Sequence, residues 1–129
     1  MRIFKTKWFD RFARQENIGD AALRGAVERA ERGLIDADLG GGLIKQRVAR
    51  PGAGKSGGYR TIISYRTASK AIFIFGFAKS GQENLSAVEL AAFREVSEAL
   101  LRLSDLEIAS EIKRGRQAEI EWNDKNLQE

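Results

Sequence analysis

The sequence contains no cysteine and no histidine in its 129 residues. Without cysteine the chain can form no disulfide, thiolate metal site or thiol nucleophile, and this absence fits a reducing compartment. Without histidine it lacks the usual zinc ligand, the Ser-His-Asp triad and the side chain whose ordinary pKa lies near neutrality. Any catalysis must therefore use lysine, arginine, tyrosine, aspartate or glutamate.

Long apolar runs are also missing. No stretch approaches the roughly 18 apolar residues of a membrane-spanning helix, and the charged segment 1–10 is unlike a secretory signal peptide. We therefore expect a cytoplasmic protein without membrane association. The length, with 43% hydrophobic and 31% charged residues, predicts one domain over residues 1–129. We place its core at about 1–103 and a tail of helix and short strand at 104–129.

Acidic residues are absent from one continuous segment, residues 39–82, which carries eight lysines and arginines. The residues before it have a net charge of +1 and those after it a net charge of −5, so the chain totals +4. A central block of one charge sign predicts a surface for a polyanion. The alternative is an ordinary solvated basic surface.

Hydrophobic periodicity predicts an α+β fold. A strand at Arg2–Lys7 leads into a helix at Trp8–Gln15, and a second helix begins at the N-cap Asp20 and ends near Gly33. Three segments rich in β-branched and aromatic residues then predict strands joined by two hairpin connections. These strands are Gly42–Arg50, Tyr59–Arg66 and Lys70–Lys79, the last apolar enough to be buried on both faces.

The C-terminal part predicts two helices and an edge strand. Ser86 and Glu89 form a capping box for a helix at Ser86–Leu103, and Ser104 caps a shorter helix that is broken at Gly115. The segment QAEIEW, with alternating apolar residues, predicts the strand. We assign the aromatic residues before it to the core, and Trp122 to anchoring the tail. The assigned core residues are Trp8, Phe9, Phe12, Phe73, Phe75 and Phe77.

The stretch GAGKS looks like the end of a nucleotide-binding P-loop but lacks its context. Ala49 stands where the first glycine is required, and Gly-Gly and a strand follow Ser56 instead of a helix. What remains is a glycine-rich hairpin loop, Pro51–Gly58, with Lys55 at its tip. Small residues let a nucleic-acid backbone approach while Lys55 supplies charge. The alternative is a flexible turn whose glycines only permit positive φ.

The residues around this loop resemble the HigB-like toxins of the RelE superfamily. The resemblance lies in GGGLIKQRVARPGAGKSGGYRTIISYR followed by IFIFGFAKS, close over residues 39–82 and looser over most of the chain. It implies a RelE-like fold with a small antiparallel sheet packed against two N-terminal helices and a C-terminal helix. It also implies a toxin that cleaves messenger RNA in the ribosomal A site, with a cognate antitoxin, often a helix-turn-helix protein, as partner.

Cleaving RNA without a metal or cofactor, as we expect here, requires cations that stabilise the charge developing on the phosphoryl oxygens. The two arginines that flank the loop suit this role best, because a planar guanidinium contacts two phosphate oxygens and stays charged. A lysine crowded by cations has a lowered pKa and can act as a base. We predict that the catalytic residues are Arg60, Arg47, Lys79 and Lys55. We predict that the RNA-binding residues are Lys45, Arg50, Tyr59, Tyr65 and Arg66.

Two features leave alternatives open. On an ideal strand Tyr59 and Tyr65 face away from Arg60, so both sets cannot line one site without a bulge, and we favour the arginines. Some relatives follow the strand-ending lysine with an arginine and later a catalytic tyrosine, where this sequence has Ser80 and Leu85. The general acid therefore stays unassigned. The alternatives to an RNase are a ParE-like inhibitor of DNA gyrase and a non-enzymatic nucleic-acid-binding module.

Overall fold

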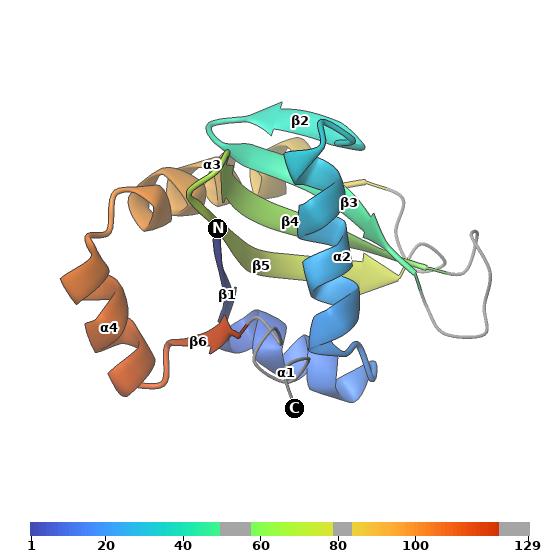
Figure 1. Cartoon of the computed structure of the whole chain (residues 1–129). Helices are drawn as coiled ribbons and strands as arrows, with labels where there is room; N and C mark the ends of the chain where they lie inside the picture. The colour runs from blue at the N-terminus through green and yellow to red at the C-terminus, as the bar shows by residue number, and fades with distance from the viewer. Residues whose placement is uncertain (50–57, 79–83, 122–129) are drawn as a thin grey trace.

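A sheet with the strand order β2-β3-β4-β5-β1-β6 forms the centre of the molecule (Figure 1). The structure is a computed structural model that describes residues 1–49, 58–78 and 84–121. The strands within these residues are β1 Arg2–Thr6, β2 Ala37–Gly40, β3 Leu43–Val48, β4 Tyr59–Arg66, β5 Lys70–Ala78 and β6 Gln117–Ile120. The helices are α1 Lys7–Gln15, α2 Asp20–Glu31, α3 Ala87–Leu101 and α4 Asp105–Lys113.

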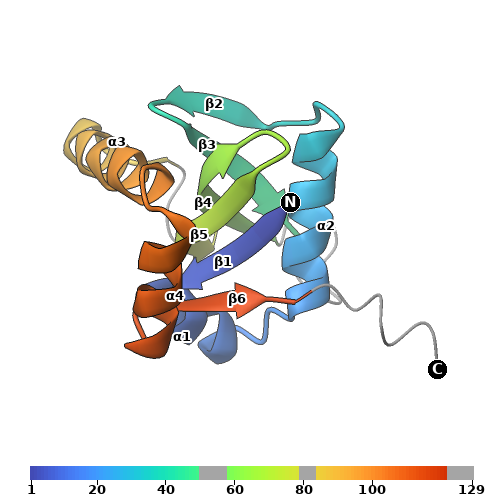
Figure 2. The ribbon, with the colours of Figure 1, turned by 60° about the vertical axis from the view of Figure 1, so that its left-hand side comes forward.

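Helices cover both faces of the sheet. Figure 2 shows α2 and α3 on opposite sides of it. The α1 and α2 side holds the larger apolar cluster, which includes Phe9, Leu23, Ile63 and Phe73. On the other side α3 covers a cluster that includes Leu43 and Ile62, and α4 covers Phe4, Ile72 and Ile108. The α+β prediction is therefore confirmed.

The sheet is antiparallel except at one place. The strands β2, β3, β4 and β5 are joined in sequence order by antiparallel pairing, and the two hairpins that join β3, β4 and β5 are those that the sequence predicts. The first strand, β1, runs parallel to β5 and antiparallel to β6. The two helices that follow β1 carry the chain across one face of the sheet to β2 at its edge. As predicted, β5 is a central strand, buried on both faces over most of its length.

The C-terminal elements pack as part of the sheet and its cover. The capping boxes at Ser86 and Ser104 are confirmed, each with reciprocal bonds to the glutamate three residues on. The predicted strand near the C-terminus is also confirmed as β6. Ile108 of α4 and Ile120 of β6 are each 1% exposed, so the apolar core extends past residue 103. Trp122 lies outside the described residues.

Three local features differ from the sequence predictions. Gly19, not Asp20, is the N-cap of α2, so no N-cap side chain accepts a hydrogen bond from the first backbone N–H groups of this helix. Asp20 instead lies 3.2 Å from Lys5 Nζ, because the ion pair draws its carboxylate toward β1. The short edge strand β2 was not predicted, since its four residues, Ala37–Gly40, include an aspartate and a glycine that disfavour strands.

Trp8 was predicted to lie in the core, and this is wrong. Its side chain is 46% exposed, whereas Phe9 beside it is fully buried. In α1 the buried residues are Phe9 and Ala13. Trp8 is offset from Phe9 by about 100° around the helix, which directs it to the rim of the core.

Gly76 of β5 leaves the space that the aromatic side chains of α1 occupy. A Cβ atom at this position would lie 2.6 Å from Cε2 of Phe12 and 3.1 Å from Cε1 of Phe9. The first distance is too short for two carbon atoms and the second is unusually tight, so a larger residue here requires the Phe12 ring to move and the Phe9 ring to adjust. The glycine therefore sets how closely α1 packs.

We predict that Gly76→Ala lowers the free energy of unfolding by about 1–3 kcal/mol through overpacking. The matched control is Gly25→Ala in the middle of α2, where an added Cβ meets nothing within 4 Å. That change should instead stabilise the protein by roughly 0.5–1 kcal/mol, because alanine favours a helix over glycine. Urea unfolding of both variants checks this pair, and equal midpoints for the two would contradict it.

Candidate nucleic-acid interface

The residues of β4 alternate between the two faces of the sheet. Tyr59, Ile63 and Tyr65 join the cluster under α1 and α2, while Ile62 joins the cluster under α3. Arg60 lies two residues before Ile62 and therefore shares the α3 face. The sequence prediction that the tyrosines and arginines of this strand point in opposite directions holds in the structure.

Arg60 stands directly opposite Arg47 of β3 in the strand register. Side chains paired across antiparallel strands project from the same face, so the two arginine side chains start from neighbouring positions on that face. Neither side chain forms an ion pair with an acidic residue of the described chain. The backbone N–H of Arg47 donates to the carboxylate of Asp36 at 2.6 Å. The backbone carbonyl of Arg47 accepts a hydrogen bond from the guanidinium of Arg29. The strands thus bring together two of the four predicted catalytic residues.

The guanidinium of Arg60 carries an unsatisfied donor. Its Nη1 atom is buried and has no hydrogen-bond partner in the described part of the chain. Burying an unpaired donor costs about 1–3 kcal/mol, and a charged donor costs more. A rotation of the guanidinium that exposed this nitrogen to a bound anion would remove the cost.

Lys45, also on β3, extends the cationic face. It pairs with Ile62 of β4, and its Nζ donates to Oδ1 of Asn84 at 2.8 Å. Lys45 and Asn84 line a cavity of about 170 Å³ together with Leu85, Leu90 and Leu39. Sequence reasoning missed Asn84, which no motif distinguishes. Leu85, where the resemblance places a tyrosine in relatives, therefore contributes an apolar wall beside Lys45.

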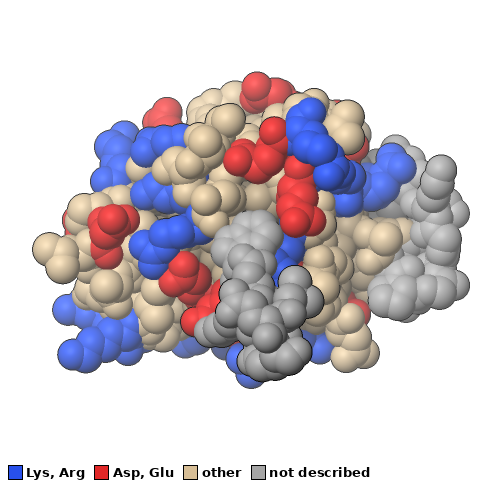
Figure 3. All heavy atoms as spheres, in the orientation of Figure 1, with Lys and Arg blue, Asp and Glu red and all other residues tan. Residues whose placement is uncertain are grey.

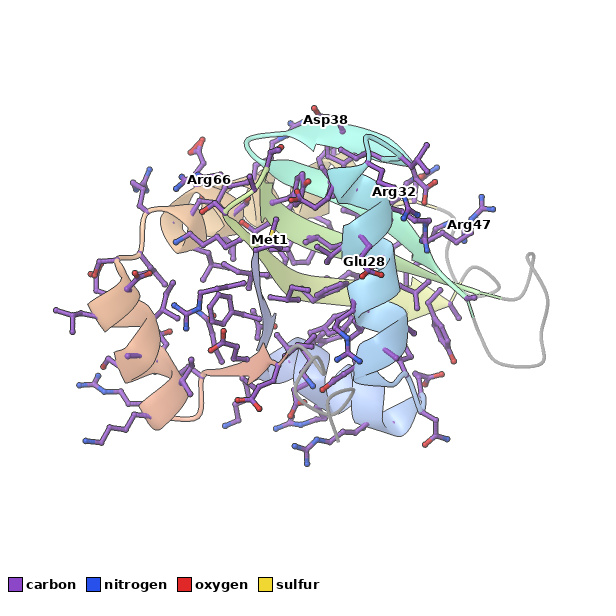
Figure 4. The ribbon with its side chains drawn as sticks, viewed as in Figure 1. Met1, Glu28, Arg32, Asp38, Arg47 and Arg66 are labelled. Carbon is purple, nitrogen blue, oxygen red and sulfur yellow. The ribbon has the colours of Figure 1, made fainter. Side chains whose placement is uncertain are left out.

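Arg66 lies away from this group. It is six residues from Arg60 along β4, which corresponds to about 20 Å of strand. Figure 4 shows Arg47 and Arg66 near opposite ends of the sheet. Arg66 is exposed beside Lys70, whose pKa is lowered by burial and secondarily by the charge of Arg66. The structure therefore does not bring Arg66 to the predicted site.

The two tyrosines predicted to bind RNA lie in the core. Tyr59 is 1% exposed and donates from its hydroxyl to Oε1 of Glu16 at 2.8 Å. Tyr65 is 8% exposed and donates to Oε2 of Glu31. A buried ring offers no face to a stacking base, so we leave both tyrosines out of the proposed site. Glu16 and Glu31 are far in sequence from the tyrosines that they bind. No local sequence pattern therefore indicated that these tyrosines are buried and hydrogen-bonded.

The remaining predicted residues are not placed. Lys55 and Arg50 belong to the loop, and Lys79 ends the predicted third strand, and all three lie outside the described residues. Their roles therefore stay sequence predictions. Within the described ranges, no group of three or more acidic side chains could hold a metal ion, and no helix is long and apolar enough to cross a membrane.

The side of the molecule that carries α2 has mixed charge. Figure 3 views the side that carries α2 and shows acidic and basic side chains interspersed. Glu28, Glu31 and Arg32 of that side line a cavity of about 410 Å³ with Met1 and Val27. Mixed charge of this kind does not attract a polyanion as a block of one sign does. The Arg47, Arg60 and Lys45 group on the α3 face is thus the better candidate for an anion.

A mixed sheet with helices on both faces and a cationic group at the end of its hairpin strands defines a small α+β protein with a candidate anion-binding face. The sequence matches the family described as RelE toxin of RelE / RelB toxin-antitoxin system, over residues 1–120. The chain therefore belongs to this family and is a toxin of a toxin–antitoxin system, which implies an antitoxin partner. No protein among those with curated descriptions matches the sequence.

The hydrogen bond from Tyr65 predicts a pH-dependent stability. Burial, and then the bond to Glu31, raises the pKa of Tyr65 from 10.0 to about 12. The folded protein therefore keeps a proton that the unfolded chain releases near pH 10. Stabilisation from this group is complete below pH 10 and is lost as the pH rises from about 10 to about 12.

We therefore expect the free energy of unfolding of the native chain to fall more steeply between these pH values than that of Tyr65→Phe. At neutral pH the substitution should cost about 0.5–1.5 kcal/mol, the usual contribution of one hydrogen bond. Urea unfolding of both proteins at several pH values makes the comparison. Parallel curves across the window would show that Tyr65 titrates alike in the folded and unfolded states.

Proposed function

We propose that this toxin is a HigB-like, ribosome-dependent endoribonuclease that cleaves messenger RNA and thereby inhibits translation in the cytoplasm. The observation that carries the proposal is the buried, unpartnered Nη1 of Arg60, placed opposite Arg47 on one face of the sheet. Its partners are messenger RNA on the ribosome and a cognate antitoxin whose contact surface is acidic and so complements the cationic face. The resemblance points to a helix-turn-helix protein for that antitoxin.

The reaction is a transfer of the phosphoryl group within the RNA. The 2′-oxygen of one nucleotide loses its proton to a base and attacks the adjacent phosphorus. The bond from phosphorus to the 5′-oxygen breaks, and that oxygen takes up a proton. The products are a 2′,3′-cyclic phosphate and a 5′-hydroxyl, with no net oxidation and no water consumed.

The cations of the α3 face suit the charge that develops in this reaction. Negative charge builds on the non-bridging phosphoryl oxygens, and a fixed guanidinium donor aimed there stabilises the transition state more than the ground state. Arg60 and Arg47 supply such donors. Lys45 can hold a neighbouring phosphate. Lys55 and Lys79 remain the sequence-predicted candidates for further phosphate contacts or for the base.

The source of the proton for the leaving oxygen differs from that in relatives with a catalytic tyrosine. Leu85 cannot donate a proton, and the hydroxyls of the buried Tyr59 and Tyr65 donate to Glu16 and Glu31. A lysine, or a group supplied by the ribosome, is left for this role. This chemistry requires no metal or cofactor.

We predict that Arg60→Ala lowers the rate of cleavage at saturating ribosomes by roughly 10²–10³-fold, as loss of one transition-state donor does in other enzymes. Arg66→Ala is the matched control, because it removes an arginine from the same strand and the same face about 20 Å away. The control should cleave at a near-native rate. Arg60→Lys should stay impaired, since lysine cannot form the two-pronged contact.

Induction of the three variants and the native chain without antitoxin completes the test. Native chain and Arg66→Ala should arrest growth and lower protein synthesis, and Arg60→Ala should do neither while accumulating as folded protein. Equal cleavage by Arg60→Ala and the native chain would remove Arg60 from catalysis. Growth arrest with DNA damage and intact messenger RNA would instead indicate a gyrase-directed toxin.

A further inference from the structure

Trp8 is an exposed aromatic side chain held in a fixed position. Its ring stacks on Phe12 at 5.4 Å between centroids with an interplanar angle of 14°, and it lies 4.7 Å from the ring of Phe75. It nevertheless remains 46% exposed. We call these three residues, Trp8, Phe12 and Phe75, the Trp8 platform. An indole fixed by two other rings has little rotational freedom left to lose when a ligand stacks on it.

The platform lies at an edge of the sheet next to the proposed RNA site. Pairing between β1 and β5 ends at Lys5 and Phe73, so α1 rather than β1 borders the second half of β5. Phe75 belongs to the apolar cluster of the α3 face, the face that carries Arg60. The Trp8 platform thus borders the same face as the cations.

The register gives the separation between the two groups. Arg60 pairs with Phe77 of β5, so Phe75 is its diagonal neighbour. Such neighbours lie about 7–8 Å apart, and the ring of Trp8 lies 4.7 Å beyond that of Phe75. Stacked nucleotides advance about 3.4 Å each along one strand. A few nucleotides therefore suffice to span from Arg60 to Trp8.

Charge beside Trp8 favours the same ligand. Arg11 follows Trp8 by three residues, so it lies about 60° around α1 and one turn along from it. Its side chain is exposed and lines a cavity of about 320 Å³ with Lys7, Arg14 and Asp10. Base stacking on an aromatic ring next to cations is how proteins hold single-stranded nucleic acid.

We propose that the Trp8 platform is a stacking site for a base of single-stranded RNA, next to the nucleotides held by Arg60 and Arg47. The inference rests on the proposed function only in that RNA is the ligand, and it does not require that the RNA be cleaved. Trp8 is a binding residue in this role and takes no part in the chemical step.

Fluorescence of Trp8 tests the proposal directly. The chain has two tryptophans, so Trp122→Phe leaves Trp8 as the single reporter. The probe is a short oligouridylate with blocked 2′-hydroxyls, which cannot be cleaved, and inorganic polyphosphate serves as an anion without bases. Saturable quenching by the oligouridylate, with polyphosphate displacing it and causing no quenching of its own, is the expected result.

Substitutions separate stacking from charge. In the same background Trp8→Leu should weaken oligouridylate binding by roughly 5- to 150-fold, the range that loss of one stacked base gives. Because this variant has no tryptophan, its binding is measured by the fluorescence anisotropy of a dye-labelled oligouridylate. Its salt dependence should not change, because no charge is lost. Trp8→Phe should keep most of the affinity. Leu106→Ala alters another exposed apolar residue, 84% exposed on α4, and should have no effect.

Urea unfolding of each variant shows whether it is folded. If Trp8→Leu does not fold, the test rests on the quenching of Trp8 and on the affinity that Trp8→Phe retains. Absence of quenching at saturation, absence of oligouridylate binding at low salt, or native affinity in Trp8→Leu would each overturn the stacking site. If Arg60→Ala abolishes cleavage while Trp8→Leu binds and cleaves normally, the proposed function stands and this inference fails. If no cleavage occurs but the oligouridylate quenches Trp8, the stacking site stands and the enzymatic function fails.

Discussion

The pairing of β3 with β4 is the constraint on which the rest of the molecule depends. Its register places Tyr59 opposite Val48 and Arg60 opposite Arg47. Because strand side chains alternate, this one register sends the tyrosine into the α1 and α2 core and both arginines to the other face. A slip of β4 by one residue would reverse every side chain and bury a guanidinium under α2. The apolar residues of β4 therefore determine where the charges stand.

That register is kept although it sets like charges against each other. Opposed like charges in a sheet destabilise it, by an amount similar to the roughly 0.2–1 kcal/mol that favourable pairs contribute. Full burial of a large apolar side chain contributes about 1.5–3 kcal/mol, and β4 buries Tyr59, Ile62 and Ile63 at 1% exposure or less. The core easily outweighs the repulsion. A cation pair and an unpaired buried donor are thus stable features of the fold, and an anionic ligand would relieve both costs.

Local sequence signals predicted most of the fold. The capping boxes at Ser86 and Ser104 and the hairpin strands are confirmed because their determinants lie within a few residues of each other. The features that the sequence did not reveal depend on contacts between distant segments. Asp20 is drawn to Lys5, and Tyr65 reaches Glu31 across 34 residues. Trp8 lies at the rim of the core beside the half of β5 that β1 does not pair with. The pattern of apolar residues in α1 did not separate this rim position from the buried position of Phe9.

For the cationic site, too, the local sequence pattern predicted the charge, whereas contacts between distant segments decide where each charge lies. The segment 39–82, with eight basic residues and no acidic one, predicted one anion-binding surface, yet β4 separates its charges. Arg60 stands with Arg47 and Lys45 at one end of the strand, whereas Arg66 stands at the other end near Lys70. Lys70 is only 8% exposed and donates to the carbonyl of Leu103, so part of the segment holds α3 and its following turn against the sheet. Charge counted along the sequence therefore overestimates how many cations one anion-binding surface contains. A strand of eight residues is long enough for the cation at one end to face a ligand while those near the other end stabilise the fold.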